Sequence, residues 1–197
     1  MERSSLSREV EEIFRVAGAI LEGHFELASG LHSATYWEKL RVLGYPHHTE
    51  RLCSMIAQHF QDEGIQVVAG PALGGMIVAF EVARHLGVRS IYAERVGEGR
   101  AFRRGFSIEP RERTLVVDDI LTTGASVLEL IKSVKRHGGD LVGVGVLVDR
   151  SPGGIDLGVP FFSCHQVFIP TYTPEECPLC AQGIPLTKPG SITREQS

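Results

Sequence analysis

The hydrophobic residues of this chain follow two spacings. Short apolar runs at residues 67–69, 90–93, 114–118, 141–148 and 159–169 predict buried strands. Apolar residues at helical spacing predict helices over residues 8–21, 48–62, 75–86 and 127–136. Because strand and helix alternate from residue 67 onward, we expect an α/β fold with a parallel, doubly wound sheet flanked by helices, preceded by a small N-terminal subdomain.

The length and composition fit one domain. With 197 residues, 43% of them hydrophobic, the chain can bury one substantial core. We expect a single domain over residues 1–197, with an N-terminal helical part to about residue 62, an α/β core over about 63–170 and a C-terminal tail over about 171–197.

Charge and hydropathy limit the partners. The net charge of −4 argues against nucleic acid or an anionic membrane as the main partner. The sequence shows neither a basic leader with an apolar segment behind it nor an apolar run near the roughly 20 residues that span a bilayer. We therefore expect a cytoplasmic protein.

The most informative segment runs from residue 114 to residue 126. A short apolar strand delivers Asp118 and Asp119 to a turn of small and hydroxyl-bearing residues that opens a helix. Ligands collect at the carboxyl ends of parallel strands, and a helix N-terminus offers unpaired N–H groups to an anion. Residues 122–126 are therefore expected to wrap the phosphate of a phosphorylated sugar. The alternative is an ordinary solvated turn at the end of a strand.

The two carboxylates need a partner other than the phosphate, which they would repel. Ionised carboxylates only accept hydrogen bonds, so Asp118 and Asp119 suit the vicinal diol of a ribose. They could also hold Mg²⁺, directly or through water. The lysine of a Walker loop is missing, which argues against a nucleoside triphosphate.

A glycine-rich loop at residues 70–75 also follows a predicted strand and opens a helix. Its backbone could approach a diphosphate closely and donate N–H groups to it. The alternative is a turn that merely needs a positive φ.

Residues 95–106 form a third candidate segment. Four arginines, Arg95, Arg100, Arg103 and Arg104, stand among glycines between two predicted strands. This pattern favours a mobile basic flap that binds phosphate and excludes water, although a solvated hairpin has the same composition.

The four cysteines, Cys53, Cys164, Cys177 and Cys180, form no regular disulfide framework and are expected to be reduced thiols. Cys177 and Cys180 have the C-x-x-C spacing of a zinc knuckle, for which Cys164 and His165 are the other candidate ligands. A tight C-terminal turn is the interpretation that we favour.

Three of these segments together resemble the type I phosphoribosyltransferases, and among them the orotate phosphoribosyltransferases. Residues 114–126 resemble the phosphoribosyl-pyrophosphate motif, residues 70–75 the pyrophosphate loop, and residues 23–33 the N-terminal Gly-x-Phe-x-Leu-x-Ser-Gly-x-x-Ser signature. Arg150 falls where that family places an orotate-binding arginine. The resemblance spans roughly residues 10–190, nearly the whole chain.

The resemblance implies a type I phosphoribosyltransferase-like sheet with an N-terminal hood, and a set of site residues. Arg95, Asp118 and Asp119 would act in catalysis, and Tyr36 or Trp37 would pack near the base. Orotate would contact Thr122 and Arg150. Phosphoribosyl pyrophosphate would contact Ala72, Leu73, Gly74, Arg95, Asp118, Asp119, Ile120, Leu121, Thr122, Thr123, Gly124, Ala125 and Ser126.

Several cations that relatives carry are absent from this sequence. Leu73 and Gly74 stand where many relatives have Tyr-Lys, Ala28 replaces a lysine, and the Lys and His of a longer flap are missing. The flap arginines would have to supply the charge, or activity would be reduced.

The resemblance implies transfer of a 5-phosphoribosyl group from phosphoribosyl pyrophosphate to orotate, with Mg²⁺ on the diphosphate and no direct protein ligand assigned to the ion. It also implies a homodimer with shared active sites. Two alternatives remain at this point: a purine or xanthine phosphoribosyltransferase, and a non-catalytic regulator that senses phosphoribosyl pyrophosphate.

Overall fold

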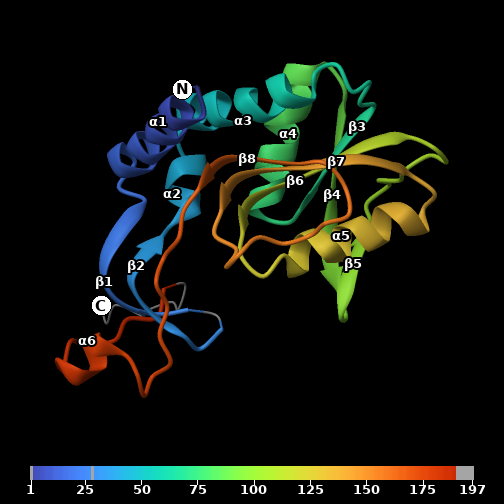
Figure 1. The fold of residues 1–197 in the computed structure, drawn as a ribbon. Coiled ribbons are helices and arrows are strands. Elements are labelled where there is room, and N and C mark those ends of the chain that lie inside the picture. Colours follow the sequence, from blue (N-terminus) through green and yellow to red (C-terminus); the bar gives the residue numbers. More distant parts are fainter. Residues whose placement is uncertain (1, 28, 190–197) are drawn as a thin grey trace, which may run out of the picture.

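The computed structural model describes residues 2–27 and 29–189 and is built around one six-stranded sheet (Figure 1). Its strands lie in the order β5-β4-β3-β6-β7-β8. They are β3 (Val67–Pro71), β4 (Arg89–Val96), β5 (Gly99–Phe102), β6 (Arg113–Leu121), β7 (Asp140–Asp149) and β8 (Phe161–Gln166). Neighbouring strands pair in parallel except β4 and β5, which form an antiparallel hairpin. The expected α/β sheet is confirmed, with one antiparallel strand at its border.

Helices cover both faces of this sheet. Helices α3 (Pro46–Phe60) and α4 (Gly74–Leu86) pack on one face, and α5 (Ala125–Arg136) packs on the other. Leu115 and Val117 of β6 belong to the core with α3 and α4, whereas Val116 belongs to the core with α5. Because both faces are buried, the strands are continuous apolar runs, which is the pattern that the sequence shows.

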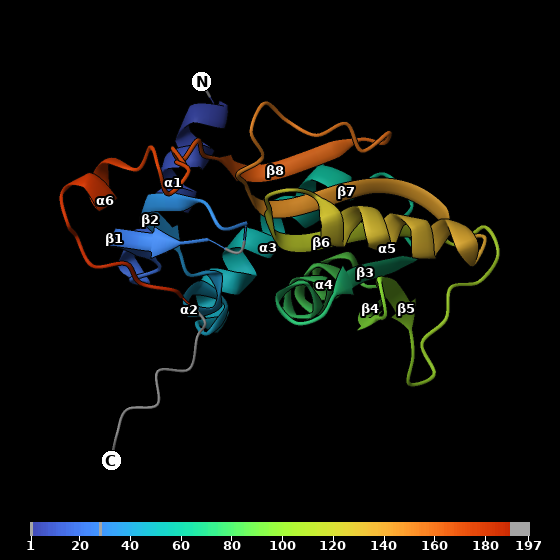
Figure 2. The same ribbon diagram turned by 90° about the horizontal axis from the view of Figure 1, so that it is seen from below.

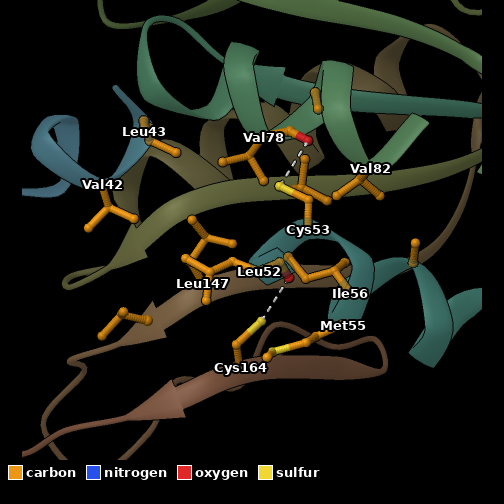
Figure 3. Packing of buried hydrophobic residues seen from close by; sticks show 14 of the residues in the cluster. Val42, Leu43, Leu52, Cys53, Met55, Ile56, Val78, Val82, Leu147 and Cys164 are labelled. Atoms are coloured by element: carbon orange, nitrogen blue, oxygen red, sulfur yellow. Dashed lines mark hydrogen bonds between the residues drawn. The ribbon is translucent and has the colours of Figure 1, made fainter. Parts of the chain in front are cut away.

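Two of the four cysteines belong to the core beside α3 and α4 (Figure 3). The sulfur of Cys53 lies 3.9 Å from the carbonyl oxygen of Val78, and that of Cys164 lies 3.5 Å from the carbonyl oxygen of Leu52. Burial raises the pKa of both thiols. Both side chains therefore behave as small apolar groups.

An N-terminal subdomain lies beside the sheet, on the left of Figure 2. It consists of α1 (Glu2–Val16), β1 (Ile20–Glu26), β2 (His32–Trp37) and α2 (Lys39–Leu43), and β1 and β2 form an antiparallel hairpin. The C-terminal tail returns to this hairpin: Tyr172 forms a bridge with His32, and Thr187 forms one with Phe25. The short helix α6 (Pro178–Ala181) lies between these two bridges. None of the helices within the described ranges combines the length and apolar character needed to cross a bilayer.

The first helix begins and ends earlier in the chain than its sequence pattern predicts. We expected a helix over residues 8–21, but α1 ends at Val16 and Leu21 lies in β1. Gly18 ends the helix because it adopts a φ of +62°, and the N–H of Ala19 donates to the carbonyl of Phe14. Leu21 continues the apolar spacing by coincidence, since the chain has already changed direction at the glycine.

Candidate active site

A cleft of about 720 Å³ opens between the N-terminal subdomain and the carboxyl ends of β3 and β6. Its wall combines the predicted phosphate turn, the glycine-rich loop, the β1–β2 hairpin and the C-terminal tail. It is lined by Glu26, Leu27, Ser29, Tyr36, Trp37, Lys39, Pro71, Ala72, Leu73, Gly74, Arg100, Asp118, Asp119, Ile120, Thr122, Thr123, Ser126, Arg150, Lys188 and Pro189.

The turn between β6 and α5 forms one end of this cleft. Gly124 precedes α5 with a φ of +74°, a conformation that suits glycine, and the chain then enters the helix at Ala125. Residues 120–127 together with Asp118 enclose a recess of about 40 Å³. The first N–H groups of a helix have no partner within it, so this recess suits an anionic oxygen group.

Arg100 brings a positive charge to that turn. Its guanidinium donates to Ser126 Oγ over 3.2 Å and contacts the carbonyl oxygen of Ala72 at 3.5 Å. The side chain is buried and lies 3.5 Å from the carboxylate of Glu129. One arginine of the predicted flap therefore connects the glycine-rich loop with the phosphate turn of its own chain.

Asp118 and Asp119 are buried at the end of β6, with 6% and 2% of their surface exposed. Asp118 Oδ1 accepts from the N–H of Asp119 at 2.8 Å, and Asp119 Oδ1 accepts from the N–H of Ile120 at 2.6 Å. Burial, followed by the neighbouring charge of Asp119, raises the pKa of Asp118 to about 8. Backbone N–H groups thus hold both carboxylates in place. Burying two adjacent acids costs free energy, and a nearby cation would lower that cost.

Lys39 supplies such a cation from the start of α2. Its ammonium lies 2.9 Å from Asp119 Oδ1. Burial acts to lower the pKa of Lys39, but the charge of Asp119 and the hydrogen bond to it outweigh burial, so the pKa is raised. Asp119 Oδ2 remains buried without a hydrogen-bond partner. The acidic pair is therefore only half compensated.

Gly74 and Gly75 of the 70–75 loop lie against these acids. A Cβ on Gly74 would stand 1.7 Å from Asp119 Oδ2, and one on Gly75 would stand 2.4 Å from Pro71 Cδ and 2.9 Å from Asp118 Oδ1. We expected these glycines to admit a diphosphate to the backbone. The structure adds a second reason for them, because only glycine lets the loop approach the carboxylates so closely.

Arg150 also lines the cleft and lies directly after β7. Its N–H donates to the carbonyl of Leu121, which fixes the backbone beside the phosphate turn. Burial lowers the pKa of its guanidinium, and its Nε atom is buried without a hydrogen-bond partner. An unpaired buried guanidinium nitrogen is costly, so this position suits a ligand carboxylate.

The two aromatic residues of β2 differ in their surroundings. Tyr36 is half-buried beside Phe25, whereas Trp37 is 5% exposed, stacks on His165 and packs against Phe14. Of the two aromatic residues expected near the base, Tyr36 is therefore the more exposed.

Most of the predicted site residues meet in the cleft. Ala72, Leu73, Gly74, Asp118, Asp119, Ile120, Thr122, Thr123, Ser126 and Arg150 line it, while Leu121, Gly124 and Ala125 line the smaller recess of the phosphate turn. Arg95 does not line the cleft of its own chain and is exposed near the end of β4. Arg104 pairs with Glu94, and Ala28 lies outside the described residues.

Sequence reasoning missed Lys39 and Lys188, although both line the cleft. Lys188 Nζ lies 2.6 Å from Glu26 Oε1 at the mouth of the cleft. Together with Arg100, these two lysines supply positive charge in the cleft, where the sequence had indicated that cations of the family are missing. No local motif marks either lysine, since each reaches the site only through the packing of the N-terminal subdomain and the tail.

Comparison with known proteins identifies this arrangement. A family model described as "Phosphoribosyl transferase domain" matches residues 47–165, which contain the glycine-rich loop of residues 70–75, the arginine-bearing segment of residues 95–106 and the acidic pair. The chain belongs to the phosphoribosyltransferase family.

Relatives of higher similarity define its place more closely. The chain is 51% identical over 183 residues to the orotate phosphoribosyltransferase of Desulforamulus reducens, covering 93% of this chain and 96% of that relative. It is 52% identical over 183 residues to the orotate phosphoribosyltransferase of Pelotomaculum thermopropionicum, with the same coverage. A crystal structure of orotate phosphoribosyltransferase from Aeropyrum pernix superimposes with a TM-score of 0.68 at 27% identity, over 80% of this chain and 93% of that one. Within the family, this chain stands among the orotate phosphoribosyltransferases.

Proposed function

We propose that this enzyme transfers the 5-phosphoribosyl group of phosphoribosyl pyrophosphate to N1 of orotate, with release of pyrophosphate. The observation that carries the proposal is the buried Nε of half-buried Arg150, which has no hydrogen-bond partner among the described residues and lies in the same cleft as the phosphate turn. A carboxylate on the base would pair with this guanidinium. The names of the relatives at about half identity support the same substrate pair.

The sugar phosphate binds at the turn of residues 122–126 in this proposal. Its 5-phosphate occupies the recess at the start of α5, where N–H groups and the hydroxyls of Thr122, Thr123 and Ser126 surround it. The ribose hydroxyls face Asp118 and Asp119, which accept hydrogen bonds. The diphosphate extends toward the loop of residues 72–74, with Arg100 on its flank.

Mg²⁺ fits the acidic end of this cleft. Hard oxygen ligands suit the ion, and Asp119 Oδ2 has no hydrogen-bond partner. Asp118 and Asp119 would hold it directly or through water, and the bound ion would neutralise charge on the diphosphate oxygens.

The reaction breaks the bond between C1 of the sugar and the diphosphate oxygen and forms a bond from C1 to N1 of orotate, and the N1 proton is taken up by the released diphosphate. Its transition state resembles an oxocarbenium ion, with negative charge growing on the leaving group. The protein therefore acts by positioning the two substrates and by placing cations at the phosphate oxygens. Within the chain's own cleft, Arg100 contacts Ser126 of the phosphate turn and Lys39 contacts Asp119, so both are candidates for this role.

We further propose that the active enzyme is a homodimer in which Arg95 serves the site of the partner subunit. Arg95 is exposed and lies outside the cleft of its own chain. A two-fold dimer would bring the β4–β5 hairpin of one subunit over the phosphate turn of the other, where a guanidinium stabilises the leaving diphosphate.

Pyrophosphate release in the presence of single free bases tests the reaction. We expect release with orotate and little with adenine, guanine or xanthine. Preference for a purine would assign the chain to a different branch of the family. Binding of phosphoribosyl pyrophosphate without release for any base would point to a regulator instead.

A further inference from the structure

Four metal-ligating side chains meet where the C-terminal tail contacts the β1–β2 hairpin, and none of the four lines the cleft. They are His24 of β1, His32 of β2, Cys177, and Cys180 of α6, and their ligand atoms all lie within 4.8 Å of one another. Two of these residues come from the hairpin and two from the tail. From the sequence, Cys164 and His165 are the candidate partners of the C-x-x-C pair.

Those earlier candidates are engaged elsewhere. Cys164 lies in the core with its sulfur near the carbonyl of Leu52 (Figure 3), and His165 Nδ1 lies 2.7 Å from Ser7 Oγ. His24 and His32 take their place because the tail folds back onto the hairpin about 150 residues earlier in the chain. Sequence spacing alone could not reveal this pairing.

The distances within the cluster fit a tetrahedral ion. Zinc bonds of about 2.3 Å to sulfur and about 2.0–2.1 Å to nitrogen place tetrahedral ligands about 3.3 Å apart for two nitrogens and about 3.5 Å apart for nitrogen and sulfur. His24 Nε2 and His32 Nδ1 are 3.0 Å apart. The sulfur of Cys177 lies 3.5 Å from His24 Nε2, and that of Cys180 lies 3.7 Å from the same atom and 3.3 Å from His32 Nδ1.

The orientation of His24 also fits a ligand. Its Nδ1 lies 2.8 Å from the carbonyl oxygen of Ile184, so this nitrogen carries the proton and donates to the carbonyl. The lone pair of Nε2 is then free to point into the cluster. A zinc-bound histidine commonly has such a backbone carbonyl on its other nitrogen, because the contact fixes both tautomer and ring orientation.

The tail has few other means of holding its place. Among residues 171–189, all of them described, Cys177 is the only buried residue. His24 and His32 are buried as well, with 3% and 5% of their surface exposed. A helix of one turn and two single bridges bury little apolar surface, whereas a structural zinc site contributes folding free energy directly.

We propose that His24, His32, Cys177 and Cys180 bind one Zn²⁺ ion in a closed structural site that fastens the C-terminal tail to the β1–β2 hairpin. All four positions are occupied by protein, so the ion has no open position for substrate. Its effect on the cleft is indirect: it anchors the segment that carries Lys188, which pairs with Glu26 at the mouth of the cleft. The proposal does not depend on which base the enzyme uses.

The test is metal analysis of full-length protein purified without an affinity tag and dialysed against metal-free buffer. We expect about one zinc per chain, and less than about a tenth of that in Cys177→Ser and in Cys180→Ser, because a site that loses one of four ligands binds far more weakly. Cys53→Ala is the matched control, since it removes a buried thiol outside the cluster, and it should retain the full zinc content.

Cobalt substitution of the unmodified protein provides a second measurement that does not depend on the folding of a variant. Tetrahedral Co²⁺ with two thiolates should give intense visible absorption and a thiolate-to-metal charge-transfer band, and added Zn²⁺ should abolish both. Removal of the metal with a chelator should make residues 170–189 the first site of subtilisin cleavage. The proposal is wrong if zinc-reconstituted wild type loses all metal on dialysis, if both serine variants hold as much zinc as wild type, or if Cys177 and Cys180 are joined in a disulfide after anaerobic purification.

Discussion

Lys39 Nζ lies 2.9 Å from Asp119 Oδ1 and joins the N-terminal subdomain to the end of β6. The lysine comes from the start of α2, directly after the hairpin, and the acid is almost completely buried. This ion pair therefore helps to fix the position of the N-terminal subdomain relative to the phosphate turn. It also places a cation beside one of two adjacent buried carboxylates.

Lys39→Met should lower both stability and activity. The variant leaves Asp119 buried without its cation, but the lysine side chain is 43% exposed, so water screens the pair and we expect a loss of only about 1 kcal/mol in the free energy of unfolding. The value of kcat/KM for phosphoribosyl pyrophosphate should fall about tenfold or more, because the hood loses its contact with the site. Denaturant titration and steady-state kinetics check both. Lys135→Met, on the exposed side of α5, is the control, and equal behaviour of the two variants would contradict the role of the pair.

Asp118→Asn should stabilise the ligand-free protein at alkaline pH while it weakens use of phosphoribosyl pyrophosphate. The unfolded carboxyl ionises near 3.8, whereas in the folded protein burial and Asp119 raise the pKa to about 8. Stability from this group is therefore present below about pH 4 and lost as the pH rises toward about 8.

Thermal unfolding of wild type and Asp118→Asn at pH 5 and pH 8.5 measures this effect. The variant should melt higher by several degrees at pH 8.5, with a smaller difference at pH 5, because about 1 kcal/mol corresponds to about 2–4 °C in a domain of this size. The same difference at both pH values would show that the carboxylate is not penalised by burial.

Gly74→Ala should abolish most activity. The added Cβ would overlap Asp119 Oδ2, so the loop must move away from the acids and take Ala72 and Leu73 with it. Gly44→Ala is the matched control, since Gly44 is exposed, does not line the cleft, has a φ of −71° and would place a Cβ no nearer than 3.3 Å from the carbonyl oxygen of Leu40. We expect kcat/KM to fall at least about a hundredfold for Gly74→Ala, as for other misplacements of about 1 Å, and to change little for Gly44→Ala. Comparable activity of the two variants would refute the steric argument.

Arg150→Ala should raise the KM for orotate about 30-fold or more, equivalent to roughly 2 kcal/mol for a buried charge-assisted contact. The KM for phosphoribosyl pyrophosphate should change much less, since the proposed partner of the Arg150 guanidinium is the carboxylate of the base and not a phosphate. Thr122→Val should act in the same direction more weakly. Initial-rate kinetics with each substrate varied in turn distinguish the two effects. An equal rise in KM for both substrates would contradict the assignment of Arg150 to orotate.

Mixed dimers test the shared site. Arg95→Ala and Asp119→Asn should each be nearly inactive as pure proteins. If Arg95 serves the partner subunit, a hybrid dimer has one site with both lesions and one intact site. Random mixing makes about half of the dimers hybrid, so refolding the variants together should restore about a quarter of wild-type activity. A mixture that stays inactive while hybrids demonstrably form would place Arg95 in the site of its own subunit.

The sequence was most informative where chemistry and local structure coincide. Asp118 and the residues of the following turn are read directly from one strand, one turn and one helix, and the structure brings them to the same cleft. The end of the first helix near Gly18 was predicted wrongly, because Leu21, three residues later, continues the apolar spacing of a helix. Gly18 is a termination signal in the sequence, but the apolar spacing favours a helix that continues past it.

Contacts between distant segments were beyond sequence reasoning. Lys39 reaches Asp119 across 80 residues, and Cys180 reaches His32 across 148. Each contact depends on how the N-terminal subdomain and the tail pack on the sheet, and no periodicity encodes that arrangement. The sequence therefore indicates zinc ligands near the cysteines in the chain, and it does not indicate the histidines of the hairpin.

The path of the C-terminal tail also affects the solubility of the molecule. A two-stranded hairpin presents two rows of unpaired N–H and C=O groups, which invite strands from other molecules. Here the N–H of His32 donates to Tyr172 on one side, and the N–H of Glu26 donates to Thr187 on the other, so the same tail occupies both margins. A chain cut after β8 would keep every residue of the sheet, yet it would expose both margins of the hairpin at once. The tail therefore protects the monomer against intermolecular β-pairing.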